Sequence, residues 1–360
     1  MAFPSARIWR NVTVALLAPV TILAHAPAFA YKPATVLDGA KPVTITAIPI
    51  DFDRDNPERK SFGKLVWRGG LNLFANSPYF GGFSTFFVDP AGKTFLSISD
   101  AGIWLRGTID YDGRKMKGVS NAVIGPLLGP DGKPLRDDQE RDSEGMTLVD
   151  GGPAGGTAYV SFERHHRILR YPFTAQKFGP PTGSLPLPPG TKKMHPNSGL
   201  EAIALLKSGP LKGTVVAFSE SLTDKNGNLQ AWLIGGPTPG PFLLKRLEGF
   251  DVTDAVVLPD GDLVVLERRF RYSEGIKMRI RRIAAKDLKP GSTIAGDVLL
   301  EATDALNIDN VEGIAVHRSA SGETILTLIS DDNYSALQRT LLMQFAIPGG
   351  KPVLAESTSR

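Results

Sequence analysis

The sequence predicts an all-β protein of the β-propeller class, with five blades favoured. Three observations predict this fold: helical apolar patterns are scarce, short β-rich runs alternate with turns, and one paired-strand segment recurs five times. Gly (38) and Pro (28) are abundant among the 360 residues, as is typical of chains built from short strands and turns. Because there is no cysteine, disulfide scaffolds, thiol nucleophiles and cysteine-based metal sites are excluded.

The first thirty residues are predicted to be a secretory signal. Arg7 and Arg10 precede an apolar run over residues 12–24, and residues 28–30 (Ala-Phe-Ala) form a small-x-small cleavage site, with cleavage near Ala30-Tyr31. A membrane anchor is the alternative, but the run is shorter than the roughly 20 residues that a spanning helix needs. We therefore expect a secreted or periplasmic protein without a membrane span, in which residues 31–360 form a single propeller domain.

The repeat consists of a short apolar strand, a polar turn, and a second apolar strand that ends in an acid-containing cluster. A third strand follows in each case. The repeats lie at residues 82–101, 143–165, 199–222, 252–270 and 311–333. They start about 53–60 residues apart, a period typical of propellers with about four strands per blade. A β-sandwich, the alternative, does not predict an acid-ended second strand five times.

Closure of the ring requires the two ends of the chain to meet. Strands are predicted in residues 43–50 and 64–74, before the first repeat, and the last repeat has only three clear strands. We expect an N-terminal strand to complete the last blade, which would remove exposed sheet edges. A sixth blade built from residues 40–76 is the alternative.

Propeller geometry predicts one acidic channel mouth. The first strand of each blade lines the channel, and the loop entering it opens on the same face as the loop leaving the antiparallel second strand. Acids lie at the starts of first strands and at the ends of second strands, where Glu163, Glu220 and Glu267 also occur. The predicted metal ligands are Asp100, Glu144, Glu201, Asp254, Glu312, Asp331 and Asp332.

So many carboxylates need positive charge nearby. Repulsion costs about 1 kcal/mol per close pair in water and more where water is scarce. A hard cation such as Ca²⁺ suits an oxygen-only site, whereas zinc prefers histidine clusters that five histidines scarcely supply. Alternatively, the acids cap turns or pair with arginines and so lock neighbouring blades.

Basic residues beside the acids could also bind an anion. The residues predicted to do so are Arg164, His165, Arg268 and Arg269.

Seven stretches of the sequence form an ordered set of motifs: Phe80-GGFS-Thr85, Asp142-SEG-Met146, Phe162-ERHHRILRY-Pro172, Asn197-SGLEAIAL-Leu206, Leu266-ERRF-Arg271, Asn310-VEGIA-Val316 and Ile329-SDDN-Tyr334. In these motifs the chain resembles the phytase-like domain family, secreted bacterial proteins described by the phrase "esterase-like activity of phytase". The resemblance covers about residues 64–347, nearly all of the chain after the signal. The resemblance implies a propeller related to calcium-dependent phosphomonoesterases, in which carboxylates hold Ca²⁺, basic residues hold phosphates, and metal-activated water attacks phosphorus.

The predicted function is therefore Ca²⁺-dependent hydrolysis of phosphate esters, with Glu144, Glu201 and Glu312 as catalytic residues. We expect a monomer that takes a small anionic substrate. A nucleic-acid partner is not expected, because the formal net charge is only +4 and no basic run occurs. Two alternatives use the same mouth: a metal-dependent lactonase or esterase, and a non-catalytic propeller that binds an anionic ligand or a partner protein.

Overall fold

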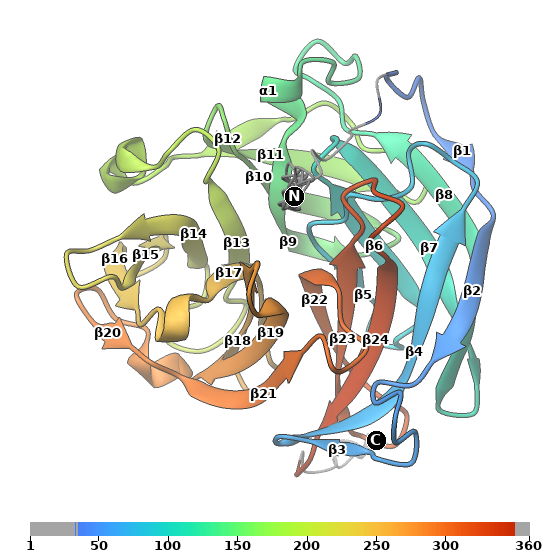
Figure 1. Ribbon diagram of the computed structural model, residues 1–360. Helices are drawn as coiled ribbons and strands as arrows, with labels where there is room; N and C mark the ends of the chain where they lie inside the picture. Colours follow the sequence, from blue (N-terminus) through green and yellow to red (C-terminus); the bar gives the residue numbers. More distant parts are fainter. Residues whose placement is uncertain (1–32, 34, 350–360) are drawn as a thin grey trace, which may run out of the picture.

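Five sheets surround a common axis in this computed structural model, which describes residue 33 and residues 35–349 (Figure 1). The predicted signal segment and its cleavage site lie outside the described residues. We number the sheets as blades 1 to 5 in the order of their first strands along the chain. Within the described part of the chain, no helix is long and apolar enough to cross a membrane.

Each blade places its first strand nearest the axis and its later strands farther out (Figure 1). Blade 1 contains β5 (Phe87–Val88), β6 (Thr94–Ser99), β7 (Ile103–Asp112) and β8 (Lys115–Pro126), with β1 (Lys41–Pro42) on its edge. Blade 2 contains β9 (Ser143–Gly152), β10 (Gly155–Phe162), β11 (Arg167–Thr174) and β12 (Gly183–Leu185). Blade 3 contains β13 (Leu200–Leu205), β14 (Val215–Thr223), β15 (Leu229–Ile234), β16 (Gly240–Leu244) and β20 (Thr293–Ile294).

The last two blades follow the same plan. Blade 4 contains β17 (Asp251–Val257), β18 (Leu263–Arg271), β19 (Gly275–Ile283) and β21 (Asp297–Thr303). Blade 5 contains β22 (Asn310–Arg318), β23 (Thr324–Asp331), β24 (Thr340–Ile347), β4 (Leu65–Ala75) and β2 (Ile45–Ile50), with β3 (Ser61–Phe62) beside β4. The short helices are α1 (Asp138–Arg141) and the 3₁₀ turns η1 (Pro189–Lys193), η2 (Leu247–Gly249) and η3 (Ala285–Asp287).

The predicted all-β, five-bladed propeller is confirmed. Each of the five repeats supplies the first two strands of one blade, and neighbouring first strands contact one another from β9 through β13 and β17 to β22, which contacts β5. The alternative of a sixth blade is wrong, because residues 40–76 form no sheet of their own. They supply β1 to blade 1, and β2, β3 and β4 to blade 5, where β4 pairs antiparallel with β24.

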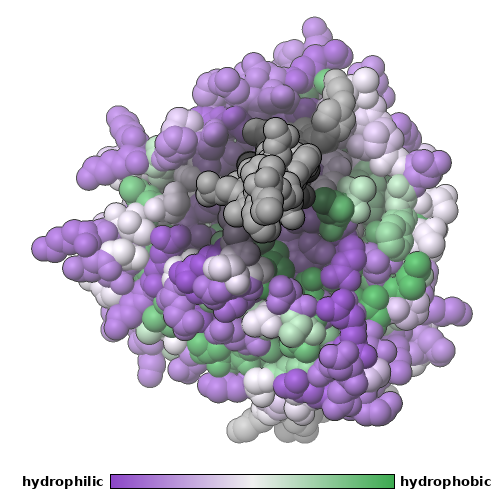
Figure 2. Space-filling view, in the orientation of Figure 1, coloured by the Kyte–Doolittle hydropathy of each residue, from purple (hydrophilic) through white to green (hydrophobic). Residues whose placement is uncertain are grey.

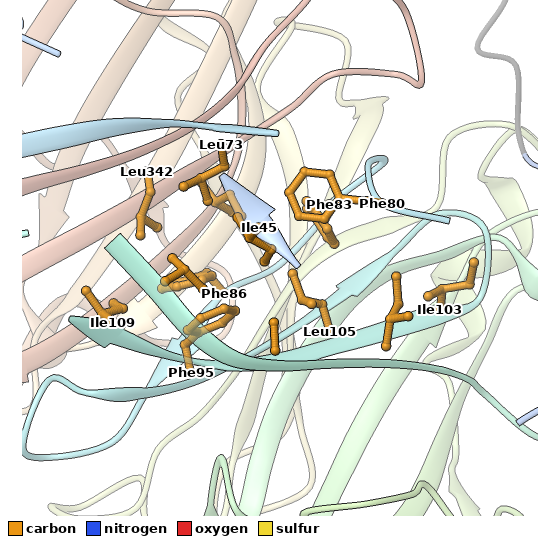
Figure 3. Packing of buried hydrophobic residues seen from close by; sticks show 14 of the residues in the cluster. Ile45, Leu73, Phe80, Phe83, Phe86, Phe95, Ile103, Leu105, Ile109 and Leu342 are labelled. Atoms are coloured by element: carbon orange, nitrogen blue, oxygen red, sulfur yellow. The ribbon is translucent and has the colours of Figure 1, made fainter. Parts of the chain in front are cut away.

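Apolar side chains between neighbouring blades form the core. At the junction of blades 5 and 1, Ile45, Leu73 and Leu342 pack with Phe95 and Leu105, all of them buried (Figure 3). Burying a side chain of this size stabilises the fold by about 1.5–3 kcal/mol. Hydrophilic residues cover most of the face seen in Figure 2, with hydrophobic residues set between them.

A β-bulge interrupts the start of the first strands. In blades 3 and 5 the pairing skips Glu201 and Glu312, and in blade 2 the irregularity covers Glu144 and Gly145. A bulge re-aims side chains at the end of a strand. In blade 4 the skipped residue is Thr253, not Asp254. Asp254, predicted as a metal ligand at the start of a first strand, therefore lies one residue after the position of the other three acids, because sequence spacing does not reveal which residue is bulged.

Candidate functional site

The ends of the five second strands meet on one face of the ring. At the end of each second strand, the last residue that lies opposite the first strand is an acid in four blades and an arginine in blade 4. Asp100, Glu163 and Glu220 each donate their backbone N–H to the carbonyl of the residue that opens the first strand. Arg268 and Asp331 lie opposite that residue in the strand register. The five equivalent residues are Asp100, Glu163, Glu220, Arg268 and Asp331.

Two further sets of acids lie beside them. The bulge acids are Glu144, Glu201 and Glu312, and the residues that open the first strands of blades 2 and 4 are Asp142 and Asp251. Electrostatic contacts join the sets, since Glu201 is affected by Glu220, Glu312 and Glu163. We call these nine residues the acidic cluster: Asp100, Asp142, Glu144, Glu163, Glu201, Glu220, Asp251, Glu312 and Asp331.

The tightest part of the acidic cluster lies in blade 2. One carboxylate oxygen from each of Asp142, Glu144 and Glu163 lies within 4.8 Å of the others. Asp142 is 1% exposed and Glu163 is 9% exposed. Arg164 forms an ion pair with Asp142 and donates to the Asn197 side-chain oxygen over 3.1 Å. This grouping of carboxylates can hold a metal ion.

Burial and repulsion raise the pKa values of the cluster acids. Burial first, then the charges of Asp142 and Glu220, raise the pKa of Glu163 to about 8. Burial raises the pKa of Glu312 to about 7 against the opposing attraction of Arg268. The pKa values of Glu201 and Asp331 are also raised well above the usual range, chiefly by burial. Without further positive charge, the folded protein therefore favours protonated forms of these groups.

Arg268 is the one cation among the five equivalent strand-end residues. Its Nε lies 3.2 Å from Glu312 Oε1. Burial alone would lower the pKa of Arg268, but attraction by Glu312, Glu220 and Glu201 raises it. Arg268 therefore offsets part of the negative charge on the side of blades 4 and 5.

The structure leaves two predicted anion-binding residues outside the cluster. Arg269 follows Arg268 in β18, and successive side chains of a strand point to opposite faces. Its guanidinium pairs with Glu274 and donates to the Glu248 carbonyl over 2.8 Å. His165 is exposed in the turn between β10 and β11. Neither prediction gains support from the geometry, whereas Arg164 and Arg268 both contact cluster acids.

Two predicted metal ligands are bound to the backbone instead. The carboxylate oxygens of Asp254 each accept a backbone N–H, from Ala255 and from Ile314 of blade 5, both over 2.8 Å. Asp332 accepts from Tyr334 N–H (2.9 Å) and Thr340 Oγ1 (3.0 Å). These contacts link blade 4 to blade 5 and hold the turn after β23.

Sequence reasoning missed Asp142 and Asp251 as site residues. Each of them lies at the opening of a first strand, across from Glu163 and Arg268 respectively. In the other blades this position holds Gly82, Gly199 and Asn310, so the acidic character is not repeated. The repeat pattern therefore gave no signal for these two acids, and the strand register places them in the cluster. Glu267, in turn, lies buried one residue before Arg268 and pairs with Arg281.

Fold and site together define a five-bladed β-propeller with a partly buried ring of carboxylates at one end of its first strands. The sequence model of the phytase-like family, described as "Esterase-like activity of phytase", matches residues 78–334. This match spans most of the chain, and the chain belongs to that family.

Other comparisons give only a distant likeness. Among solved structures, a crystal structure of a protein of unknown function from Dyadobacter fermentans is 11% identical, with a TM-score of 0.38. That match covers 86% of this chain and 99% of the other. No curated protein matches the sequence.

Proposed function

We propose that the protein is a Ca²⁺-dependent hydrolase of phosphate esters that uses the acidic cluster as its metal site. The observation that supports this proposal most strongly is the charge balance of the site. Nine acids from all five blades gather there, and three arginines, Arg164, Arg246 and Arg268, form ion pairs with Asp142, Asp251 and Glu312. The family description, which names esterase-like activity, supports ester hydrolysis.

The donor atoms fit calcium. The site offers carboxylate oxygens at several distances, and Ca²⁺ takes six to eight oxygen ligands in flexible geometry. Asp142, Glu144 and Glu163 of blade 2 would hold one ion together with one carboxylate oxygen of Glu201 of blade 3, whose other oxygen would stay available to accept a proton. Bound Ca²⁺ would supply positive charge that attracts a phosphate oxygen and eases deprotonation of water.

The side chains of the protein would orient the phosphate, accept a proton and position the attacking water. Arg268 would orient a non-bridging phosphate oxygen, since its guanidinium lies among Glu312, Glu220 and Glu201. Glu201 interacts with acids of blades 2, 3 and 5, and we assign its carboxylate oxygen the role of accepting the proton of the attacking water. Glu144 and Glu312, the other predicted catalytic acids, would position that water from either side.

The test measures phosphate release from p-nitrophenyl phosphate by the full chain. We expect release with added Ca²⁺, loss of release with chelator, and a fall of about 100-fold or more for Glu201→Gln. The matched control is Glu58→Gln, an exposed acid outside the cluster, which should keep full activity. Absence of release from several phosphate esters in the presence of Ca²⁺ would contradict the proposal.

An esterase or lactonase is the second candidate, favoured by the words "esterase-like" in the family description. The same preparation assayed with an aryl acetate and a lactone separates the two functions. Turnover of these substrates without turnover of phosphate esters would assign the site to carboxylic esters. A non-catalytic propeller would bind Ca²⁺ and gain thermal stability while turning over neither class. Secretion and a monomeric state stay predictions.

A further inference from the structure

A second candidate site lies at the opposite end of the ring from the acidic cluster. A cavity of about 560 Å³ opens between blade 1 and blade 5. Lys93, just before β6, and Tyr111, near the end of β7, line it from blade 1, while His317, near the end of β22, lines it from blade 5. Because β22 starts at the acidic cluster and β6 ends there, these residues lie at the far ends of the same strands.

The cavity is positively charged. Arg68, Lys93 and Arg114 line it together with one acid, Glu323. The two carboxylate oxygens of Glu323 contact Arg68 and, over 3.6 Å, Arg114. Lys93 is exposed and forms no ion pair with the residues described. The charge of Asp89 also acts on Tyr111 and His317, so the three cations exceed the nearby acids by one charge, which favours an anionic ligand.

Two buried nitrogen atoms in the wall lack a hydrogen-bond partner. They are Arg68 Nε and His317 Nδ1, for which the described residues provide none. His317 is only 8% exposed, and buried polar atoms in folded proteins nearly always have a partner. Burial also lowers the pKa of His317 to about 4, so its ring is neutral and offers one donor and one acceptor.

The rest of the wall is already fixed by its own contacts. The Tyr111 hydroxyl donates to the Gly92 carbonyl over 2.8 Å and accepts from Gln344 Nε2 over 2.8 Å. The bond between Gln344 and Tyr111 joins blade 5 to blade 1, and both residues line the cavity. The cavity wall is therefore held in place without a ligand. Ala91, Ala320 and Ile325 supply apolar surface.

We propose that this cavity binds a small organic anion, with its carboxylate or phosphate group at Lys93, Arg114 and Arg68 and its apolar body against Ile325. Both anionic groups share the chemistry that recognises them here: a negative charge and several acceptor oxygens. The proposal does not depend on the proposed hydrolase activity, because no residue of the acidic cluster takes part.

Calorimetric titration of the full chain tests the proposal. The protein is first freed of divalent cations on a chelating resin, so that the acidic cluster does not attract anions. The probes are benzoate, phenylphosphonate and the neutral benzamide. We expect at least one of the two anions to bind saturably and benzamide not to bind, and the tighter of the two anions identifies the preferred group.

Charge-removing variants locate the binding. Lys93→Ala/Arg114→Ala should weaken anion binding by about tenfold or more, since both side chains are exposed and their removal leaves the fold intact. Lys225→Ala/Lys289→Ala removes the same charge from exposed positions outside the cavity and should bind as the unmodified protein does. The proposal is overturned if neither anion binds, if benzamide binds equally well, or if the first double variant binds like the control.

Discussion

At the scale of single residues, Arg268 is the side chain that breaks the pattern of negative charge at the ends of the second strands. Four blades place an acid at the end of the second strand, and blade 4 places Arg268 there. Glu312 pairs with Arg268 on the side of blades 4 and 5, whereas the three carboxylates of blade 2 lie within 4.8 Å of one another and Arg164 pairs with Asp142. We therefore place the proposed metal ion on the blade 2 side.

Removal of Arg268 should destabilise the protein. Arg268→Met removes the paired cation of Glu312 and part of the attraction on Glu220, and because the Arg268 side chain is 30% exposed the cost should be about 1–3 kcal/mol. Arg271→Met, which removes a half-exposed arginine paired with Glu274, should cost no more than about 1 kcal/mol. Urea unfolding in the absence of Ca²⁺ measures both. Equal losses would show that Arg268 does not offset the cluster charge.

Glu163 should make stability depend on pH when calcium is absent. Its pKa is about 8 in the folded protein, against 4.5 for an ordinary glutamate, because of burial and the charges of Asp142 and Glu220. The folded state thus holds a proton that the unfolded chain releases. Its stabilising contribution is fully present below pH 4.5 and is lost as the pH rises through about 8.

The measurement is the melting temperature of calcium-free protein from pH 5 to pH 9. We expect a fall with rising pH that is shallower in Glu163→Gln. A melting temperature that rises over this range, or an unchanged slope in the variant, would contradict the assignment.

At the scale of elements, the bulges decide which side chains reach the site. In blades 3 and 5 the bulged residue is a glutamate of the acidic cluster, and in blade 4 it is Thr253, whose hydroxyl donates to the Val311 carbonyl over 3.1 Å. Asp254, one residue later, joins the backbone of the next blade. Because the bulge in blade 4 lies at Thr253, the acid that follows it, Asp254, does not take the position of the bulged glutamates and instead links blade 4 to blade 5.

Asp254→Ala should therefore affect stability more than function. It leaves the buried N–H groups of Ala255 and Ile314 without their acceptor, at about 1–3 kcal/mol for each. Asp254→Asn keeps an acceptor oxygen and should lose less. Urea unfolding and Ca²⁺ titration of the same samples separate the roles. Weakened Ca²⁺ binding with unchanged stability would instead support Asp254 as a metal ligand.

Much of this element structure could be predicted, because strand pairs and turns leave a local pattern in the sequence. The five repeats marked the first two strands of every blade, and the acids at their ends marked Glu163, Glu220 and Asp331. The orientation of Arg269 and the equivalence of Thr253 could not be predicted in the same way. Both depend on strand register, which contacts between distant strands determine.

At the scale of the whole molecule, the junction of blades 5 and 1 joins the two ends of the described chain. β2 and β4 come from the N-terminal part and lie in blade 5, so the packing of Leu73 against blade 1 connects the first and last sheets (Figure 3). The same junction forms the positively charged cavity. The acidic cluster and this positively charged cavity thus lie at opposite ends of one ring.

Leu73→Ala should destabilise the protein by about 2–5 kcal/mol, because this buried side chain would leave a cavity between the blades. Val298→Ala, at an exposed position on β21, should change stability by less than about 0.5 kcal/mol. Urea denaturation measures both values. A small loss for Leu73→Ala would mean that the junction contributes little to holding the ring together.

The central claim is that acids from different blades share one cation site, and a crystal structure grown with Ca²⁺ tests it most directly. We predict anomalous density with oxygen ligands at about 2.3–2.6 Å, supplied by Glu144 or Glu163 of blade 2 together with Glu201 of blade 3. Well-ordered carboxylates in the acidic cluster with no ion between them, from crystals grown at saturating Ca²⁺, would contradict it.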